Sequence, residues 1–288
     1  MNYFDLHCDT LTEFADGKRT SHITKEKAAV FEKYKQCYAI FLDDGVHGNP
    51  AFEKAKLYYR FYKENWNLFK GINTEPMLTL ENAVSLGGNL DNIGFWKRCG
   101  VRACTLTWNG KNELGFGSSF PNGDGLTDFG KKAVSALENA EIIVDVSHLN
   151  EAGFNDVLRT AEKPFIASHS NCYSLCSHPR NLKDYQIKEI ISSGGLVGIC
   201  YYKLFLGNGY IFDLIFNHVC HVIRLGGENN VCFGSDFDGA EMEKELDSIE
   251  KVKNLYDYFR GKGFDDELCE KIFYRNADNF FNNVLHIN

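Results

Sequence analysis

The sequence of 288 residues, with 44% hydrophobic and 24% charged residues, has the composition of a globular protein and not of a disordered one. Its net charge of −8 and scattered basic residues argue against nucleic-acid binding, because contact with phosphates requires a basic patch. No stretch has the apolar length of a membrane span and the N-terminus lacks a secretion signal, so we expect a cytoplasmic protein with no membrane partner.

Short β-branched or aromatic runs alternate with longer amphipathic runs, which is the pattern of βα units around a parallel sheet. The expected strands are residues 3–7, 38–43, 76–80, 101–106, 142–147, 164–168, 196–201 and 231–235. The expected helices are 51–70, 90–98, 128–140, 151–161, 183–193, 211–225, 245–261 and 266–284, with Thr127 or Asp128 and Asn150 as N-caps. Eight such units predict an α/β fold, a TIM-like (β/α)8 barrel with a single domain over residues 1–288. A doubly wound open sheet is the alternative, but the Gly-x-Gly-x-x-Gly turn often found there is missing from the sequence.

The ten cysteines contain no Cys-x-x-Cys pair, and several lie inside apolar runs. Structural zinc fingers and disulfide frameworks both fit this spacing poorly. We expect most of the cysteines to be reduced residues of the core.

The segment YFDLHCDT, residues 3–10, places Asp5, His7 and Asp9 at alternate positions. Alternate side chains of an extended strand share one face, so these three ionisable groups are expected to point the same way. On a buried face they need compensation, and a divalent cation is the usual one beside a histidine. An edge strand with this face in water is the alternative.

Further ionisable residues follow other expected strands, at the end where TIM barrels carry their active sites. They are Glu81, His148, His169 and Asp236. Singly, each has an ordinary explanation: a satisfied histidine at a strand exit, a glutamate that caps a helix, or a turn around Asp236 and Asp238. Gathered with His7 and Asp9 at one barrel mouth, however, they would repel one another or stay unpaired unless two divalent cations bind them.

The donor atoms of this set are nitrogen and oxygen without thiolate, which suits zinc at catalytic sites and is compatible with manganese or cobalt. Three carboxylates and a bridging hydroxide balance the charge of two divalent ions. Two such ions lower the pKa of a shared water and polarise a carbonyl or phosphoryl oxygen.

Several segments resemble those of the membrane (renal-type) dipeptidases, within the metal-dependent amidohydrolase superfamily, and they occur in that family's order. They are FDLHCDT, TLEN, GVRACTLTWN, GLTDFGKKAV, IIVDVSHLN, PFIASHSNCYSLCSHPRNLKD and VCFGSDFDG. The stretch from SHSN to HPRN and the GSDFDG motif are distinctive, whereas the C-terminal NADNFFNNVL is similar but weaker.

The resemblance implies a dinuclear zinc dipeptidase, with His7 and Asp9 on one ion, His148 and His169 on the other, and Glu81 as the bridge. A hydroxide that bridges the ions would attack the amide of a dipeptide while the metals hold its carbonyl oxygen. Asp236 would take the proton from the bridging water and pass it to the leaving amine.

Other residues are placed around the substrate by the same resemblance. Arg180 in SHPRN would grip the terminal carboxylate with its planar guanidinium, although a surface arginine near a turn is the alternative. Tyr202 matches a substrate-contacting tyrosine of the family, and core packing explains it as well. Metal-bound imidazoles usually donate their free N–H to an acceptor, so Asp5 and Asp238 are candidates for that supporting role.

The sequence departs from the vertebrate members of the family after TLT, where they have a histidine and this chain has Trp108 and Asn109. Indole neither accepts a proton nor ligates zinc. Either Trp108 or Asn109 supplies an oxyanion contact, or the metals act alone, or the tryptophan simply closes the top of the barrel. The vertebrate enzymes are also secreted and membrane-anchored, so their location is not transferred; a homodimer is expected only from the family's tendency.

Two rival functions remain open from the sequence. The same barrel and metals could hydrolyse a cyclic amide, a lactone or a phosphoester, and Arg180→Ala separates these because only an anionic substrate depends on the arginine. A non-catalytic barrel that serves in binding is the third hypothesis, which the metal content of the purified protein would decide.

Overall fold

The computed structural model describes residues 1–18 and 21–284. Within this part of the chain, seven parallel strands form one sheet in the order β5-β4-β3-β2-β1-β7-β6. The strands are β1 (Tyr3–Cys8), β2 (Tyr34–Phe41), β3 (Thr74–Glu81), β4 (Val101–Thr105), β5 (Ile143–Asp145), β6 (Val197–Ile199) and β7 (Val231–Phe233). The α/β prediction with a parallel sheet is confirmed, although β2 begins and ends earlier than the expected 38–43.

The strand expected at residues 164–168 is the exception, because the structure gives it only isolated bridges. Ile166 pairs in parallel with Asp145 of β5, and Ala167 pairs in parallel with Val197 of β6. The backbone N–H of Ser168 is diverted to the carboxylate of Asp145, which interrupts the regular ladder. The prediction of a regular strand is therefore wrong here, but the segment still contacts both edge strands of the curled sheet.

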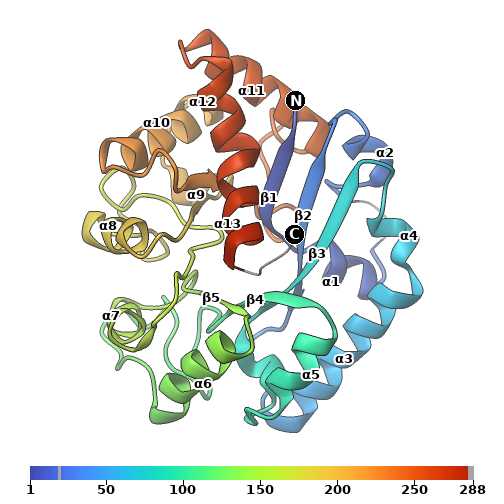
Figure 1. Cartoon of the computed structure of the whole chain (residues 1–288), viewed down its shortest axis with the longest axis vertical. Helices are drawn as coiled ribbons and strands as arrows, with labels where there is room; N and C mark the ends of the chain where they lie inside the picture. Colours follow the sequence, from blue (N-terminus) through green and yellow to red (C-terminus); the bar gives the residue numbers. More distant parts are fainter. Residues whose placement is uncertain (19–20, 285–288) are drawn as a thin grey trace.

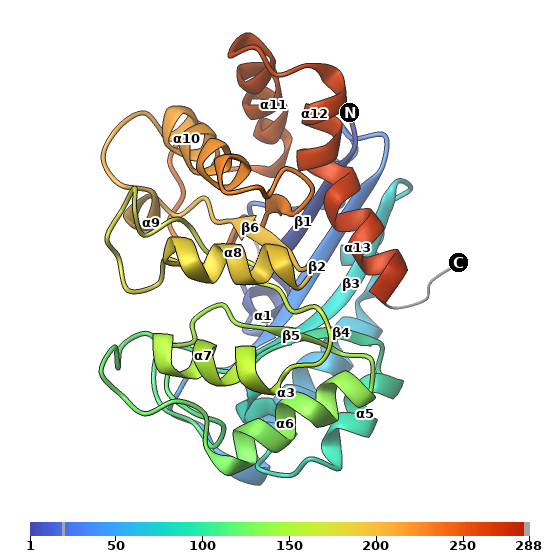
Figure 2. The same ribbon diagram turned by 60° about the vertical axis from the view of Figure 1, so that its left-hand side comes forward.

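Helices cover the outside of this sheet (Figures 1 and 2). In the described residues they are α1 (Thr10–Ala15), α2 (Lys25–Ala28), α3 (Gly48–Glu64), α4 (Trp66–Phe69), α5 (Asn92–Arg98), α6 (Asp128–Asn139), α7 (Glu151–Thr160), α8 (Asp184–Ser192), α9 (Lys203–Leu206), α10 (Ile211–Arg224), α11 (Val252–Gly261), α12 (Asp266–Glu270) and α13 (Asn276–Val284). The predicted N-caps are confirmed for α6 and α7, because the side chains of Thr127 and Asn150 accept from Gly130 N and Gly153 N.

Three long helices of the prediction are wrong in detail. The helix expected at 51–70 is divided at Asn65, whose side-chain amide donates to the carbonyl oxygen of Phe61 and ends α3. The helix expected at 245–261 begins only with a 3-10 turn at Ile249–Lys251. A π-helical turn at Lys271–Arg275 interrupts the helix expected at 266–284 and separates α12 from α13.

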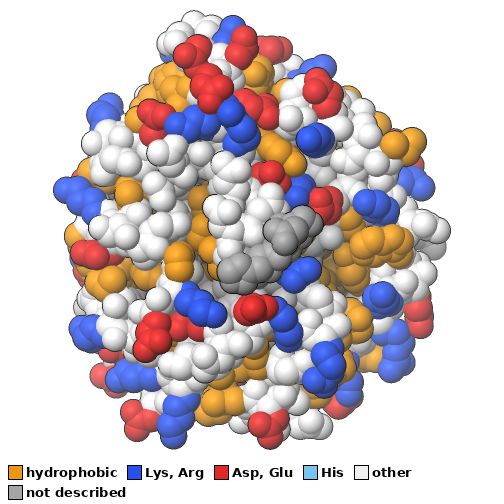
Figure 3. All heavy atoms as spheres, in the orientation of Figure 1, with side chains coloured by type: hydrophobic (Ala, Val, Ile, Leu, Met, Phe, Trp, Pro, Cys, Tyr) orange, Lys and Arg blue, Asp and Glu red, His pale blue; other side chains and the backbone are white. Residues whose placement is uncertain are grey.

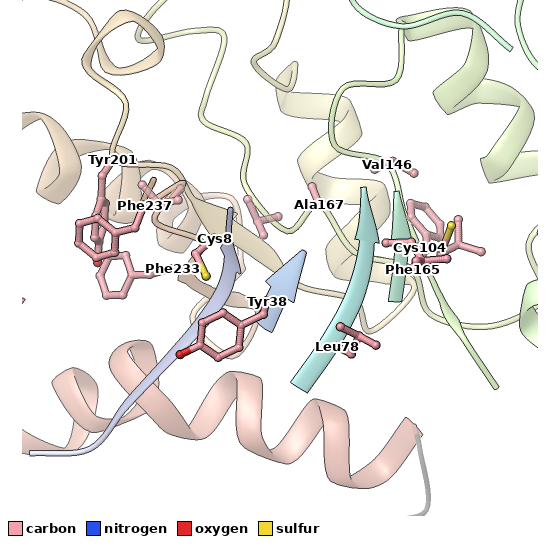
Figure 4. Packing of buried hydrophobic residues seen from close by; sticks show 14 of the residues in the cluster. Cys8, Tyr38, Leu78, Cys104, Val146, Phe165, Ala167, Tyr201, Phe233 and Phe237 are labelled. Atoms are coloured by element: carbon pink, nitrogen blue, oxygen red, sulfur yellow. The ribbon is translucent and has the colours of Figure 1, made fainter. Parts of the chain in front are cut away.

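Two groups of buried side chains lie on the two faces of the curled sheet. The outer cluster packs between the sheet and the surrounding helices, and Figure 4 shows members from β1 to β4, namely Cys8, Tyr38, Leu78 and Cys104. The inner cluster takes side chains from β1 to β5 and β7, from the residue before β6 and from 164–168, namely Phe4, Leu6, Cys37, Met77, Ala103, Ile143, Ile166, Leu196 and Cys232. Phe281 of α13 packs on Phe4 with ring centroids 5.2 Å apart, so α13 covers the amino end of the strands (Figure 1).

Strand β1 contains a β-bulge that changes the expected alternation. Asp5 pairs with Gln36 but Cys8 pairs with Tyr38, so three steps on β1 match two on β2. As a result Leu6 belongs to the inner cluster whereas Cys8 belongs to the outer one, although they are two residues apart. Regular alternation would place Leu6 and Cys8 on one face of β1, but an extra residue re-aims the side chains beyond it.

The surface facing the viewer in Figure 3 carries Lys and Arg side chains interspersed with Asp and Glu. No helix within the described ranges 1–18 and 21–284 has the length and apolar character needed to cross a membrane. All ten cysteines are free thiols, and seven of the ten are buried hydrophobic residues of the core, as expected.

Candidate metal centre and active site

The five predicted metal ligands lie together beyond the carboxyl ends of the strands. His7 belongs to β1 and Asp9 follows it, Glu81 ends β3, His148 follows β5, and His169 follows the segment 164–168. All five side chains are buried, with residue exposures of at most 7%. Five buried ionisable groups from distant parts of the chain therefore share one small volume.

Glu81 is the centre of this arrangement. Its Oε2 lies 3.3 Å from Nε2 of His7, while its Oε1 lies 2.9 Å from Nε2 of His148. The same Oε1 is 3.7 Å from Nε2 of His169. The two carboxylate oxygens thus face different imidazoles.

The separations between donor atoms fit the coordination of a metal. Nε2 of His7 is 3.4 Å from Oδ2 of Asp9 and 3.3 Å from Oε2 of Glu81. Ligands about 2.0–2.1 Å from a tetrahedral zinc are separated from each other by about 3.3 Å. Nε2 of His7 and Oδ1 of Asp9 are also buried without a hydrogen-bond partner, so the site has donor atoms that the protein itself leaves unused.

The other ring nitrogens of His148 and His169 show which tautomer each ring adopts. Nδ1 of His148 lies 2.9 Å from the amide oxygen of Asn109, an acceptor that also receives the hydroxyl of Ser118. Nδ1 of His169 lies 2.8 Å from Oγ of Ser168, which donates its own proton to Asp145. A carboxylate only accepts, so the serine oxygen must accept from Nδ1–H. Both rings carry their proton on Nδ1.

The Nε2 atoms of these two rings are only 2.8 Å apart. Burial lowers the pKa of His148 to about 4, and burial together with the charge of His7 holds the pKa of His169 well below its ordinary value. Both rings are therefore neutral, and their unprotonated Nε2 atoms face each other and Glu81. A cation between them removes this repulsion, so the residues fit a metal.

The remaining charges are strongly coupled. Burial alone would lower the pKa of His7, but Glu81 and Asp9 raise it well above its ordinary value. Burial would raise the pKa of Glu81, yet the charge of His7 holds it well below its usual range. Burial and the charge of Glu81 raise the pKa of Asp9 to about 7. Without an ion, a proton on His7 thus compensates the buried carboxylates.

Asp236 and Asp238 follow β7 with φ values of 66° and 67°, in a region that side chains other than glycine rarely adopt. Oδ1 of Asp236 lies 3.9 Å from Nε2 of His7, and burial is the main cause of its raised pKa. The carboxylate of Asp238 instead accepts from the hydroxyls of Thr10 and Ser21 and from the N–H of His22. Asp236 faces the ligands, whereas Asp238 holds the start of α1 and residues 21–22.

Asp5 also lies behind the ligands. Its carboxylate accepts from the backbone N–H and the hydroxyl of Ser235, at 2.8 and 2.6 Å, and from the backbone N–H of His7 at 3.2 Å. Asp5 therefore ties β1 to the segment after β7 through Ser235, and it also holds the main chain of His7.

A pocket of about 410 Å³ opens onto the ligands and has the size of a small-molecule site. Its lining includes Asp9, Glu81, Trp108, Asn109, His148, Tyr202 and Asp236. Trp108 packs edge-on against Phe41 with ring centroids 5.2 Å apart, and Tyr202 packs edge-on against Phe205 at 5.0 Å. The pocket thus has aromatic walls and a charged floor.

A second pocket of about 260 Å³ meets the first at His148 and is lined by Arg180. The side chain of Arg180 is buried, and its Nη2 donates to the carbonyl oxygen of His169 at 3.1 Å. Its Nε has no hydrogen-bond partner, and the guanidinium lies 5.3 Å from the centre of the Phe205 ring. A buried cation with a free donor stands next to the candidate centre.

Sequence reasoning missed Asp145, Ser168 and Phe41. The signal for Asp145 was an acid within the apolar run IIVDV, and Ser168 directly precedes a candidate ligand. Phe41 ends β2 and gave no signal, because its place beside Trp108 depends on the pairing of non-adjacent segments.

A buried set of imidazoles and carboxylates at the carboxyl end of a parallel α/β sheet defines the class of metal-dependent hydrolases. Residues 67–286 match the sequence model of one family, described as membrane dipeptidase (peptidase family M19). The chain belongs to this family, within the amidohydrolase superfamily, and its class of enzyme is a metal-dependent dipeptidase.

Similar proteins agree with this placement. An uncharacterized protein encoded in the pqqA 5′ region of Klebsiella pneumoniae is 33% identical over 217 residues, which cover 71% of this chain and 80% of that protein. The crystal structure of dipeptidase AC, a metallopeptidase of family M19, has 25% identity and a TM-score of 0.90, with 98% of each chain covered. A metallopeptidase from Rhodobacter sphaeroides, solved with a phosphinate mimic of the dipeptide L-Ala-D-Ala, has the same fold, with 23% identity, a TM-score of 0.90 and 98% coverage of each chain.

Proposed function

We propose that this chain is a dinuclear zinc dipeptidase that hydrolyses the amide bond of dipeptides. The observation that carries the proposal is Glu81, whose oxygens face His7 on one side and the pair His148 and His169 on the other. His7 and Asp9 would hold one ion and the two remaining histidines the other. The nitrogen and oxygen donors suit zinc, and manganese or cobalt are the alternatives.

When bound, two divalent cations would lower the pKa of a water molecule and polarise the scissile carbonyl. Asp236 accepts a proton from the attacking water and returns it to the leaving amine, for which its raised pKa and its place on the pocket wall are suited. Family M19 and a solved metallopeptidase with this fold support a metal-dependent dipeptidase as the class of enzyme.

Arg180 would bind the terminal carboxylate of the dipeptide through its guanidinium, whose Nε has no hydrogen-bond partner. Its buried charge favours an anionic substrate over the uncharged lactones or cyclic amides considered from the sequence. Trp108 and Tyr202 would contact the substrate from the two aromatic walls of the pocket. The amide oxygen of Asn109 holds the ring of His148, so we assign Asn109 to the support of that ring and not to an oxyanion contact.

We also infer that the curled sheet and the segment 164–168 form a TIM-like (β/α)8 barrel, folded as a single domain. The inner cluster supports this inference, because β1 to β5, β7, the segment 164–168 and Leu196 beside β6 all contribute side chains to it. A homodimer and a cytoplasmic location stay predictions.

The proposed function is tested by metal analysis and a substrate panel. Purified protein is expected to contain up to two zinc ions per chain, to lose activity to a chelator and to regain it with added zinc. It is expected to cleave dipeptides, including some with a C-terminal D-residue, and to leave tripeptides intact. Metal-replete protein that cleaves no member of a broad dipeptide panel would refute the substrate assignment.

A further inference from the structure

We propose that Asp145 is a positioning residue that acts through Ser168 to fix the tautomer of His169. In that tautomer Nε2 of His169 is free to ligate an ion. This inference rests on the proposed function, because it concerns how the proposed metal centre is prepared by the protein around it.

Asp145 is buried at the end of β5, and four donors saturate its carboxylate. Oδ1 accepts the backbone N–H groups of Ser147 and Ser168, at 2.9 and 3.0 Å. Oδ2 accepts the hydroxyls of Thr105 and Ser168. Because the hydroxyl proton of Ser168 is committed to Asp145, the serine oxygen presents only lone pairs to His169.

This arrangement distinguishes the two halves of the carboxylate. Oδ1 organises the backbone where β5 and the segment 164–168 end, which is a structural task. Oδ2 sets the direction of the hydrogen bonds that run from Nδ1 of His169 through Ser168. Only the second task decides which nitrogen of the ring carries the proton.

The substitution Asp145→Asn separates the two tasks. Its amide oxygen must stay at the Oδ1 position, because two backbone N–H groups point there. The amide NH2 then occupies the Oδ2 position and donates to Ser168. The hydroxyl proton of Ser168 turns toward Nδ1 of His169 at 2.8 Å, which is closer than the other neighbouring oxygen, Oγ of Ser147 at 3.3 Å. The ring must carry its own proton on Nε2, where it blocks ligation.

The structure also provides matched controls. Thr105→Val removes the other hydroxyl that reaches Oδ2 without changing the path to the ring. Ser168→Ala removes the hydroxyl that links Asp145 to His169 and keeps the backbone contacts of the carboxylate. His148 is held by Asn109 and not by Asp145, so its ring serves as an internal reference in the same sample.

The experiment records long-range ¹H–¹⁵N spectra of the metal-free, full-length protein labelled with ¹⁵N-histidine, with signals assigned by His148→Gln and His169→Gln. The wild type is expected to show Nδ1–H for both rings. Asp145→Asn is expected to shift His169 to Nε2–H and to leave His148 unchanged. In competition with a chromophoric chelator, zinc affinity is expected to fall by about 10- to 100-fold in Asp145→Asn and Ser168→Ala, but to stay near the wild-type value in Thr105→Val.

The outcomes distinguish this inference from the proposed function. If the wild type binds no zinc, the proposed centre fails, whatever tautomer the spectra show. If the wild type binds zinc while Asp145→Asn keeps Nδ1–H on His169 and the wild-type affinity, the role of Asp145 is overturned and the centre stands. Should Asp145→Asn not fold, Ser168→Ala decides, and an unchanged zinc affinity in that variant overturns the inference.

Discussion

The substitution Glu81→Gln is the most direct test of the candidate centre. Glutamine keeps the length of the side chain but replaces one carboxylate oxygen with an NH2 group, which donates and cannot ligate a cation. In the structure each oxygen of Glu81 has its own partner, at 3.3 Å from His7 and 2.9 Å from His148. Whichever way the amide turns, one of the two positions loses its ligand and the site loses a negative charge.

The expected magnitude follows from this sharing. Changes to residues that merely support a metal ligand cost about 10- to 100-fold in affinity. Loss of a ligand shared by two ions is expected to lower the zinc affinity of one of the two sites by at least the upper value, about 100-fold or roughly 2.7 kcal/mol. Mass spectrometry of the metals and competition with a chelator measure the stoichiometry and the affinity of each site.

Glu138→Gln is the matched control, because Glu138 is also a buried glutamate and lies on α6. Its carboxylate accepts from the backbone N–H groups of Glu162 and Lys163, away from the metal ligands. This variant is expected to unfold at a lower temperature and to keep its full zinc content. If Glu81→Gln bound two zinc ions with wild-type affinity, the interpretation of Glu81 as a bridge would be refuted.

Three further changes test other parts of the site and of the fold. Arg180→Ala is expected to raise KM for dipeptides by about tenfold to a hundredfold, because a charge-assisted contact is lost, and an unchanged KM would contradict the role of Arg180. Asp236→Asn is expected to lower kcat by about 10²- to 10⁴-fold with zinc retained, and a loss of zinc instead would make Asp236 a ligand. His218 is buried, accepts from Cys172 N, and has a pKa lowered by burial to about 4. It stays neutral in the folded state while the unfolded chain binds a proton, so stability falls as the pH drops from about 6.5 to about 4. The free energy of unfolding is measured in urea with chelator-treated protein at each pH. Between about pH 6.5 and 4 it is expected to decrease by up to about 3 kcal/mol less in His218→Asn than in the wild type. Parallel pH profiles of the two proteins would contradict this role of His218.

The candidate ligands could be predicted from the sequence because each lies at or just after a strand, where a parallel sheet gathers its chemistry. His169 was found in this way although its strand is only two isolated bridges. A sequence motif can therefore indicate where a side chain lies even when the segment before it is not a regular strand.

Other features depend on contacts between distant segments, which no local pattern records. The bulge in β1 appears only through its pairing with β2, and it decides that Leu6 and Cys8 point to different clusters. The sequence offered Asp5 as a partner for an imidazole N–H, whereas the structure places Asp5 on the backbone of His7 and on Ser235. The contact of Asp145 with Ser168 joins residues 23 positions apart, so the path to His169 could not be read locally.

Helix α13 has a consequence for how this protein can vary. It seals the inner cluster at the amino end of the strands, with Phe281 against Phe4, while Glu81 and its neighbours occupy the opposite end. Thermal stability can therefore be changed by repacking the aromatic contact between α13 and β1, at a distance from the reacting groups.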